Sequence, residues 1–320
     1  MLKGIAMLRR FLSPSLAFGL LAGGLQFATA TQNVTSVSST FTPGTPSNSE
    51  GYTYENSQQT LTGFSTATSN YAISSGADNV FVRRNNTTAN QSSNWYTSSG
   101  VGTNLSGTHE DSYTQMLRSN NVLSGSDNTF ANTGTGGQFG NIERIDFTWN
   151  SGLTVNNSLA FAVFDRGAAG AHDGFGIAAI TGIDAAGNPT AFGSLLIVAS
   201  GWGGATNPIG DMNYRLFRYA NGDDLTATTD STGTATQGIG GIVLTAADLG
   251  LTNGSTVYGY ALMGSDVTAS NSAQLLDWLN GTYYPTTTDG NTGGGGIDLA
   301  SFNGFQIVAV PEPVTLPALL

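Results

Sequence analysis

The feature that most constrains this fold is the spacing of its apolar residues, which come in short runs separated by clusters of glycine, asparagine, serine and aspartate. Over residues 145–149 apolar and polar residues alternate, which is typical of a strand with one buried face. From Asp78 onward such runs follow one another closely, as they do in β-sandwich proteins. The pattern therefore predicts an all-β chain.

Further strands are predicted where apolar residues occupy both faces of a short run, as in the centre of a sheet. These runs span residues 159–164, 175–183, 195–199, 214–219, 257–263 and 305–310. Two short helical pieces are also predicted, a capped turn over 245–250 and a helix over 271–280 whose leucines face the core. The helical crossovers that parallel sheets need are missing, so we expect an antiparallel two-sheet sandwich of jelly-roll or Greek-key type.

Composition excludes several classes of function. The chain has no cysteine, which rules out disulfides, thiol catalysis and cysteine-bound zinc. It carries 21 acidic against 10 basic residues, for a net charge of −11, and such a surface repels phosphate backbones. We therefore expect no nucleic-acid partner.

The first 30 residues have the pattern of a secretory signal peptide. Three basic residues lie among the first ten, an apolar run covers 11–25, and small side chains stand at Ala28 and Ala30. A membrane anchor is the alternative, but Pro14 interrupts a run that is already shorter than the ~20 residues of a spanning helix. We predict that signal peptidase cleaves after Ala30 and that the protein is extracellular or held at the cell surface.

Near the other end, Pro311, Glu312 and Pro313 follow the last predicted strand and precede an apolar stretch over 314–320. This triplet resembles the PEP-CTERM sorting signal of exosortase-processed bacterial proteins. The resemblance implies that a membrane-embedded exosortase recognises the signal, so that membrane contact is transient. The family's transmembrane helix and basic cluster do not follow the triplet here. We therefore expect residues 311–320 to be a truncated form of the signal, on a protein that is either anchored or released.

The region between the two ends divides by composition. Residues 31–75 are rich in serine, threonine and asparagine, which predicts a loose arm or edge strands laid over the main domain. Residues 76–310 are predicted to form the β-sandwich domain. Segments 141–147, 159–167 and 240–260 also resemble the β-rich extracellular domains that often precede such sorting signals. That resemblance implies a fold and a location, and no activity.

Three groups of residues are candidate metal sites. Asp165, His172 and Asp173 could converge at a loop mouth as metal ligands or as an acid–base pair, or they could be a polar loop in which aspartates cap turns. The glycine run 293–296 with Asp298 and the turn 221–224 present oxygen ligands suited to calcium, although both are also ordinary flexible loops. Structural calcium is the one cofactor that these patterns leave open, and no catalytic residue is predicted.

Aromatic residues are candidates for stacking on sugars. Trp202 lies in a glycine-rich segment and is the best candidate for an exposed ring, although a core position suits it better. Trp149 is predicted to be core because it falls on the apolar face of its strand. The remaining candidates are Trp95, Trp278, Tyr283 and Tyr284.

Together these patterns predict a non-catalytic exported protein of the cell surface or the extracellular matrix. Its expected partners are signal peptidase and exosortase during export, and exopolysaccharide or other surface proteins afterwards. One alternative is a carbohydrate-binding protein or a weak hydrolase that uses two carboxylates. Another is a structural coat protein that self-associates through its edge strands.

Overall fold

A computed structural model of the protein describes residues 26–27, 32–42, 47–49, 52–54, 58–84, 94–97, 114, 117–118, 121–130, 142–219, 227–229, 235–285, 296–301 and 305–310. In this part of the chain the backbone is predominantly strand, and nearly all strand pairs are antiparallel. The prediction of an all-β, antiparallel chain is therefore confirmed.

Helix α2 spans Ser272–Leu276. The strands are β1 (Gln26–Phe27), β2 (Gln32–Thr42), β3 (Ser47–Ser49), β4 (Tyr52–Tyr54), β5 (Gln58–Thr66), β6 (Asn70–Gly76), β7 (Asn79–Arg84), β8 (Asn94–Thr97), β9 (Ser124–Asp127), β10 (Ile142–Thr154), β11 (Leu159–Gly167), β12 (Phe175–Ile183), β13 (Pro189–Val198), β14 (Ile209–Tyr219), β15 (Ala227–Thr229), β16 (Ala235–Thr245), β17 (Thr256–Gly264) and β18 (Phe305–Val310). The predicted strands over 175–183 and 305–310 match β12 and β18 at both ends.

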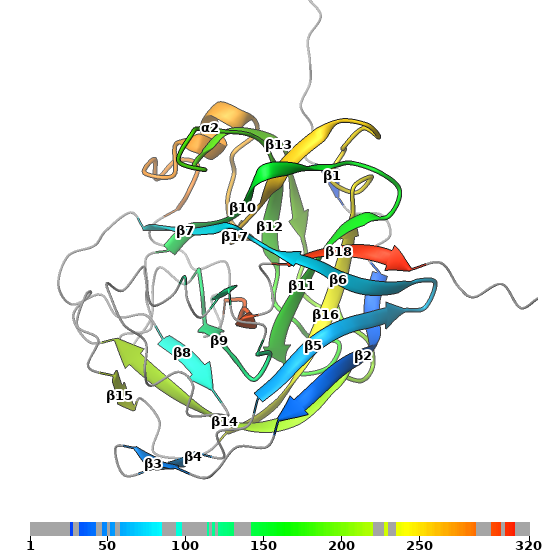
Figure 1. Cartoon of the computed structure of the whole chain (residues 1–320). Helices are drawn as coiled ribbons and strands as arrows, with labels where there is room; N and C mark the ends of the chain where they lie inside the picture. The colour runs from blue at the N-terminus through cyan, green and yellow to red at the C-terminus, as the bar shows by residue number, and fades with distance from the viewer. Residues whose placement is uncertain are drawn as a thin grey trace, which may run out of the picture.

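One large sheet has the strand order β1-β13-β12-β17-β10-β7. Its neighbours are antiparallel except at the edge, where the two residues of β1 run parallel to β13. Figure 1 shows this sheet in the upper part of the molecule, beneath α2. We call it the upper sheet.

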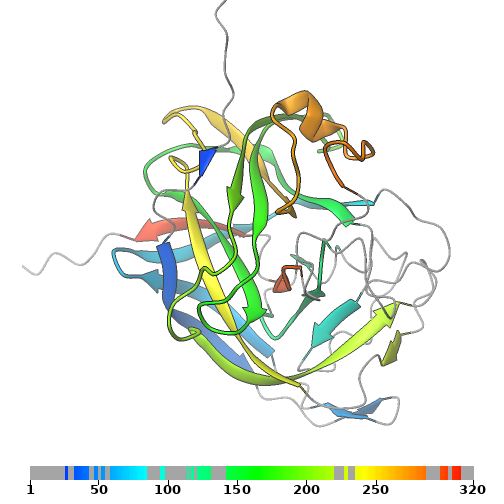
Figure 2. The same cartoon turned by 180° about the vertical axis from the view of Figure 1, so that it is seen from behind.

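Six further strands close into a ring, which we call the barrel. Strand β11 pairs with β16, and the ring then runs through β2, β5, β6 and β18 before returning to β11. Every pair in it is antiparallel. Figure 2 shows these strands from behind. The predicted two-sheet sandwich is therefore not what forms, because β11 is hydrogen-bonded along both edges and its sheet closes on itself.

The barrel includes the segment that composition marked as an arm. Strands β2, β5 and β6 lie within residues 31–75 or extend just beyond them, and each is hydrogen-bonded on both sides. The ring also has an extension, because β14 pairs with the part of β16 that β2 leaves unpaired. Strands β8 and β15 pair with β14, and β9 pairs with β8. Serine and threonine are compatible with these positions because both suit a pleated, partly solvated surface.

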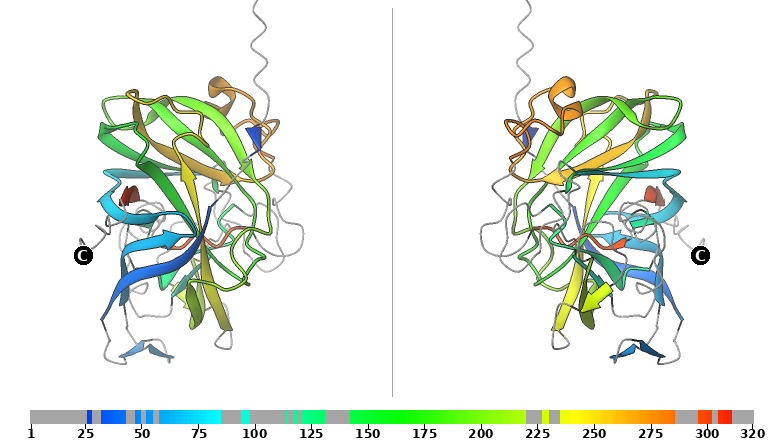
Figure 3. Two further views of the ribbon diagram at one scale, coloured as in Figure 1. Left: turned by 90° about the vertical axis from the view of Figure 1, so that its right-hand side faces the viewer. Right: turned by 90° about the vertical axis from the view of Figure 1, so that its left-hand side faces the viewer.

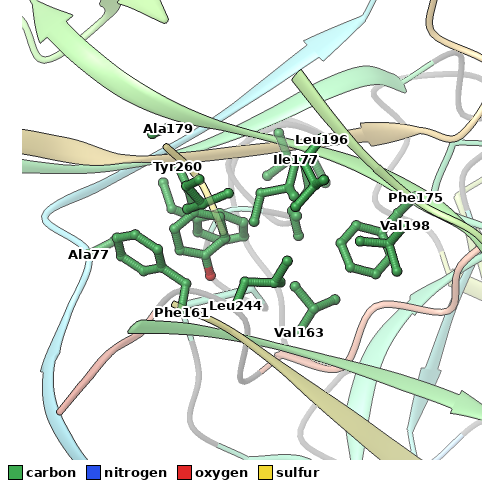
Figure 4. Packing of buried hydrophobic residues seen from close by; sticks show 14 of the residues in the cluster. Ala77, Phe161, Val163, Phe175, Ile177, Ala179, Leu196, Val198, Leu244 and Tyr260 are labelled. Carbon is green, nitrogen blue, oxygen red and sulfur yellow. The ribbon is translucent and has the colours of Figure 1, made fainter. Parts of the chain in front are cut away.

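Strands β11 and β16 carry side chains of two separate cores. On β11, Phe161 and Val163 point toward the upper sheet, whereas Ala162 and Phe164 point into the barrel, as the two-residue period of a strand requires. Figure 4 shows Phe161, Val163 and Leu244 facing Ile177, Leu196 and Tyr260 of the upper sheet. We call the cluster between the upper sheet and the barrel the inter-layer core, and the cluster inside the barrel the barrel core.

The far face of the upper sheet is covered by α2 and the chain around it (Figure 3). The helix begins after Asn271, whose side chain accepts a hydrogen bond from the backbone N–H of Gln274 at 3.0 Å. Leu275 is fully buried, but the helix ends at Leu276, so the predicted core position of Leu279 is wrong and that side chain is 64% exposed. Residues 245–250 form the predicted capped turn, in which Thr245 Oγ1 accepts a hydrogen bond from the Asp248 N–H at 3.3 Å.

The layer formed by α2 and the chain around it explains why the predicted solvated face of β10 is buried. Ile145 and Trp149 lie in the inter-layer core, as their alternation predicts. Asp146, expected on a solvated face, is fully buried because the α2 layer covers it. Arg83 and Arg144 both bond its carboxylate, at 2.9 and 2.6 Å, which provides the charge pairing that a buried carboxylate needs.

Several predictions concern residues outside those described. Ala28, Ala30 and Pro311, Glu312 and Pro313 are among them, so the two processing signals remain predictions. Within the described ranges, no helix combines the length and the apolar character that crossing a bilayer requires.

Two buried tyrosines give a matched test of this packing. The Tyr260 hydroxyl, in the inter-layer core, has no hydrogen-bond partner among the described residues, whereas the Tyr284 hydroxyl donates to the backbone oxygen of Leu275 at 2.8 Å. An unpartnered buried polar group costs about 1–3 kcal/mol. We expect Tyr260→Phe to raise the free energy of unfolding in urea by about 1 kcal/mol, and Tyr284→Phe to lower it by about as much. A less stable Tyr260→Phe protein would contradict the assignment of an unpaired hydroxyl.

Candidate functional site

Five charged side chains are buried together at the end of strand β11. We call them the buried charge cluster, and each is at most 9% exposed. Its members come from β9, from β11, from the connection between β11 and β12, and from the segment 296–301. They are Asp127, Asp165, Arg166, His172 and Asp298.

The strand places two of these residues on opposite faces. Asp165 and Arg166 are neighbours on β11, so one follows Val163 toward the inter-layer side and the other follows Phe164 toward the barrel side. Asp298 connects both, because its backbone N–H donates to Asp165 Oδ1 at 2.7 Å and its carbonyl accepts from the Arg166 N–H at 3.1 Å. The segment 296–301 is thereby held along the end of β11.

Arg166 lies between two carboxylates. Its guanidinium pairs with Asp127 and with Asp298, and it stacks on the ring of Tyr214 with Cζ 3.8 Å from the ring centroid. One cation cannot balance two buried anions. Burial, reinforced by the negative charge of Asp298 and opposed by Arg166, raises the pKa of Asp127 to about 7.

His172 makes a hydrogen bond with each of its ring nitrogens. Nδ1 lies 3.1 Å from Asp165 Oδ2, and Nε2 lies 2.9 Å from Asn207 Oδ1. The amide of Asn207 is oriented by its own donation to the Gly167 carbonyl at 2.9 Å. Both ring nitrogens therefore face oxygens that can accept hydrogen bonds, which favours the doubly protonated imidazolium. Burial opposes that charge, but Asp165 and Asn207 outweigh it and raise the pKa of His172.

The surroundings of His172 shut it off from solvent. The ring is fully buried and stacks on Trp202 with 4.7 Å between centroids. Trp202 is fixed in turn by its Nε1–H, which donates to the Asp173 carbonyl at 2.7 Å. Gly203 and Gly240 pack against the imidazole so closely that a Cβ on either would collide with it. The imidazole is therefore enclosed by protein groups.

The structure brings together only part of the predicted metal or acid–base group. Asp165 and His172 do pair, but inside the protein and not at a loop mouth, and Asp173 contributes its backbone N–H to Asp165 at 3.1 Å. No group of three metal-ligating acids, histidines or cysteines occurs among the described residues. The metal-ligand interpretation is therefore not supported for this part of the chain.

The structure describes only part of the two candidate calcium sites. Asp298 is committed to Arg166 and to the backbone N–H of Asn128, which donates to it at 2.7 Å, so its oxygens are already used by the protein. Its neighbours 293–295 and the turn 221–224 lie outside the described residues.

Three of the six candidate aromatic residues belong to the interior, and Trp278 and Tyr283 are half-buried. Trp202 is only 7% exposed and lies in the inter-layer core, so the alternative of an exposed ring is wrong. Trp149 is core, as predicted, and Tyr284 is fully buried. The Trp278 ring contacts two guanidiniums, those of Arg83 and Arg144, whose Cζ atoms lie 5.1 and 5.3 Å from its centroid. The side chain of Trp95 is outside the described part of the structure.

A pocket of about 540 Å³ opens beside the buried charge cluster. The connection between β11 and β12, the connection between β13 and β14, and the adjoining parts of β14 and β16 form its walls. Asn207 belongs to both features, because it lines the pocket and bonds His172. Asn207 thus links the pocket to the buried His172.

Sequence reasoning missed Asn207, Asp127 and the role of Arg166. One signal was available, because Asp165 and Arg166 directly follow a run that is apolar on both faces. Charges that continue such a strand are buried unless the strand ends, and buried charges need partners. Which partners they find is a property of the tertiary fold, since Asp127 and Asp298 are far away in the chain.

Comparison of the chain with family models, curated proteins and solved structures finds no match. The chemistry of the site therefore rests on its own geometry. That geometry combines a buried, charge-balanced cluster with an open pocket beside it.

The pH dependence of stability follows from three members of the cluster. In the folded protein, burial raises the pKa of Asp127 to about 7 and that of Asp165 to about 6, and the pKa of His172 is also raised. Between about pH 4 and pH 8 the folded state therefore binds more protons than the unfolded state, so stability falls as pH rises. The stabilisation by His172 is complete below about pH 6.5 and is lost as pH passes its raised pKa.

We expect the free energy of unfolding to be higher at pH 5 than at pH 8 by at least about 1 kcal/mol, measured by urea denaturation at fixed ionic strength. Asp127→Asn removes one titrating group and should reduce this difference. Asp184→Asn is the control, because hydrogen bonds from Asn188 lower the pKa of this exposed carboxyl and move its titration below the window. Greater stability at pH 8 would overturn the assignment.

Proposed function

We propose that this protein is a non-catalytic, exported component of the cell surface or the extracellular matrix. The observation that carries the proposal is the burial of the Asp165–His172 pair, with both ring nitrogens of His172 occupied. A general base must reach the proton it removes, directly or through one water. An imidazolium enclosed by protein groups supports a role in holding the fold together.

The location rests on the two ends of the sequence. The pattern around Ala28 and Ala30 supports export and cleavage by signal peptidase. The triplet Pro311, Glu312 and Pro313 supports sorting by an exosortase-type system. The absence of cysteine and the acidic composition are compatible with an extracellular protein.

The rival two-carboxylate hydrolase is tested by turnover. We expect the purified protein to release no reducing sugar from soluble polysaccharides. Release that disappears when a single acid is replaced by its amide would favour the hydrolase over the non-catalytic role.

Export is tested at the cleavage site. When the gene is expressed in a Gram-negative host, the mature protein should begin at Thr31, as determined by mass spectrometry of the intact chain. Ala30→Phe should accumulate as the uncleaved precursor, because the peptidase requires a small side chain there. Thr29→Phe is the matched control, since the middle position of the motif is unrestricted, and it should be cleaved normally. A wild-type protein that retains Met1 and stays in the cytosol would contradict the proposal.

A further inference from the structure

We infer that the pocket beside the buried charge cluster binds a neutral saccharide unit. Its volume of about 540 Å³ lies within the range of sites that hold small ligands. The inference deepens the proposed function, on which it rests for the expectation that the bound sugar is not cleaved. The proposed site binds sugar through polar groups and not by stacking on Trp202, because that ring is buried.

The lining of the pocket has the chemistry of a hydroxyl-binding site. Its polar groups are two hydroxyls, two amides and one carboxylate, and the other lining residues are glycine and alanine. Amides donate and accept, hydroxyls do both, and a carboxylate accepts from two hydroxyls at once, which matches the alternating donors and acceptors of a sugar ring. These polar residues are Thr206, Asn207, Asp211, Thr236 and Gln237.

Two of these groups are held in place before any ligand arrives. Asn207 is fixed by His172 and by the Gly167 carbonyl, at 2.9 Å each. The Tyr214 hydroxyl donates to Gln237 Oε1 at 3.1 Å, so the amide hydrogens of Gln237 are what it presents to a ligand. Groups that are fixed in advance lose little entropy on binding.

Charge selects among saccharides. Asp211 is exposed in the pocket, and among the described residues no arginine, lysine or histidine lines it. The whole chain has a net charge of −11, so a uronate or a phosphorylated sugar would meet repulsion both locally and at long range. The pocket therefore favours neutral hexoses over acidic ones.

The experiment uses two pocket variants and one control. Gly210 lines the pocket on β14, and a Cβ built there meets no atom within 4 Å, so Gly210→Trp adds a ring beside the pocket with no clash at the backbone. Asp211→Asn removes the carboxylate charge. Asp277→Asn changes the same charge at an exposed position beyond the end of α2. Unfolding in urea should give the three variants wild-type stability, which shows that each is folded.

Purified proteins are applied to an array of neutral hexose oligosaccharides and of uronate-containing oligosaccharides. We expect saturable binding of at least one neutral glycan and none of the uronates. For that glycan, Asp211→Asn should weaken binding roughly tenfold and Gly210→Trp should abolish it, while Asp277→Asn binds as wild type. The inference would be overturned if no neutral glycan binds, or if both pocket variants bind the glycan as tightly as the wild-type protein does.

These outcomes separate the pocket from the proposed function. If a neutral glycan binds and is also cleaved, the non-catalytic role fails and the binding site stands. If no glycan binds while the mature chain still begins at Thr31, the binding site fails and the exported role stands.

Discussion

The structure depends on one shared wall, made by strands β11 and β16. Over residues 159–166 of β11 and 238–244 of β16 both faces are buried, one in the inter-layer core and the other in the barrel core. Burying a residue such as Phe161 or Phe164 contributes about 1.5–3 kcal/mol. The upper sheet and the barrel therefore meet through alternate residues of the same strands, which joins the two layers into a single folded unit.

The shared wall also dictates the buried charge cluster. Asp165 and Arg166 continue β11 beyond its apolar residues, but the surrounding strands and the segment 296–301 still cover them. Water cannot solvate them there, so partners from distant parts of the chain must do so. With His172 charged and one proton retained on Asp127, the three aspartates and two cations balance. The cluster thereby fixes which segments can lie against the end of the wall.

The strands were predictable from sequence because their information is local. Alternation in Ile145 to Trp149 and the doubly apolar run from Leu159 report directly on the faces that are buried. Closure of the barrel was not predictable, because it depends on which edges of β11 find partners, and no local pattern encodes that choice. The pairing of Asp165 with His172 was within reach of sequence, since only seven positions separate them. Their burial was not, because Trp202 and Gly240 come from other parts of the chain.

His172 and Asn207 are hydrogen-bonded to each other, but only Asn207 lines the pocket. The imidazole is used entirely by the protein, since Asp165 and Asn207 satisfy both of its nitrogens. Asn207 uses one amide hydrogen to bond the Gly167 carbonyl and one lone pair of Oδ1 to bond His172. Its side chain also lines the pocket and has a second amide hydrogen and a second lone pair. Proton transfer needs an accessible base, whereas recognition needs only a fixed donor and acceptor. The same hydrogen bond that occupies Nε2 of His172 holds the Asn207 amide in one orientation at the wall of the pocket.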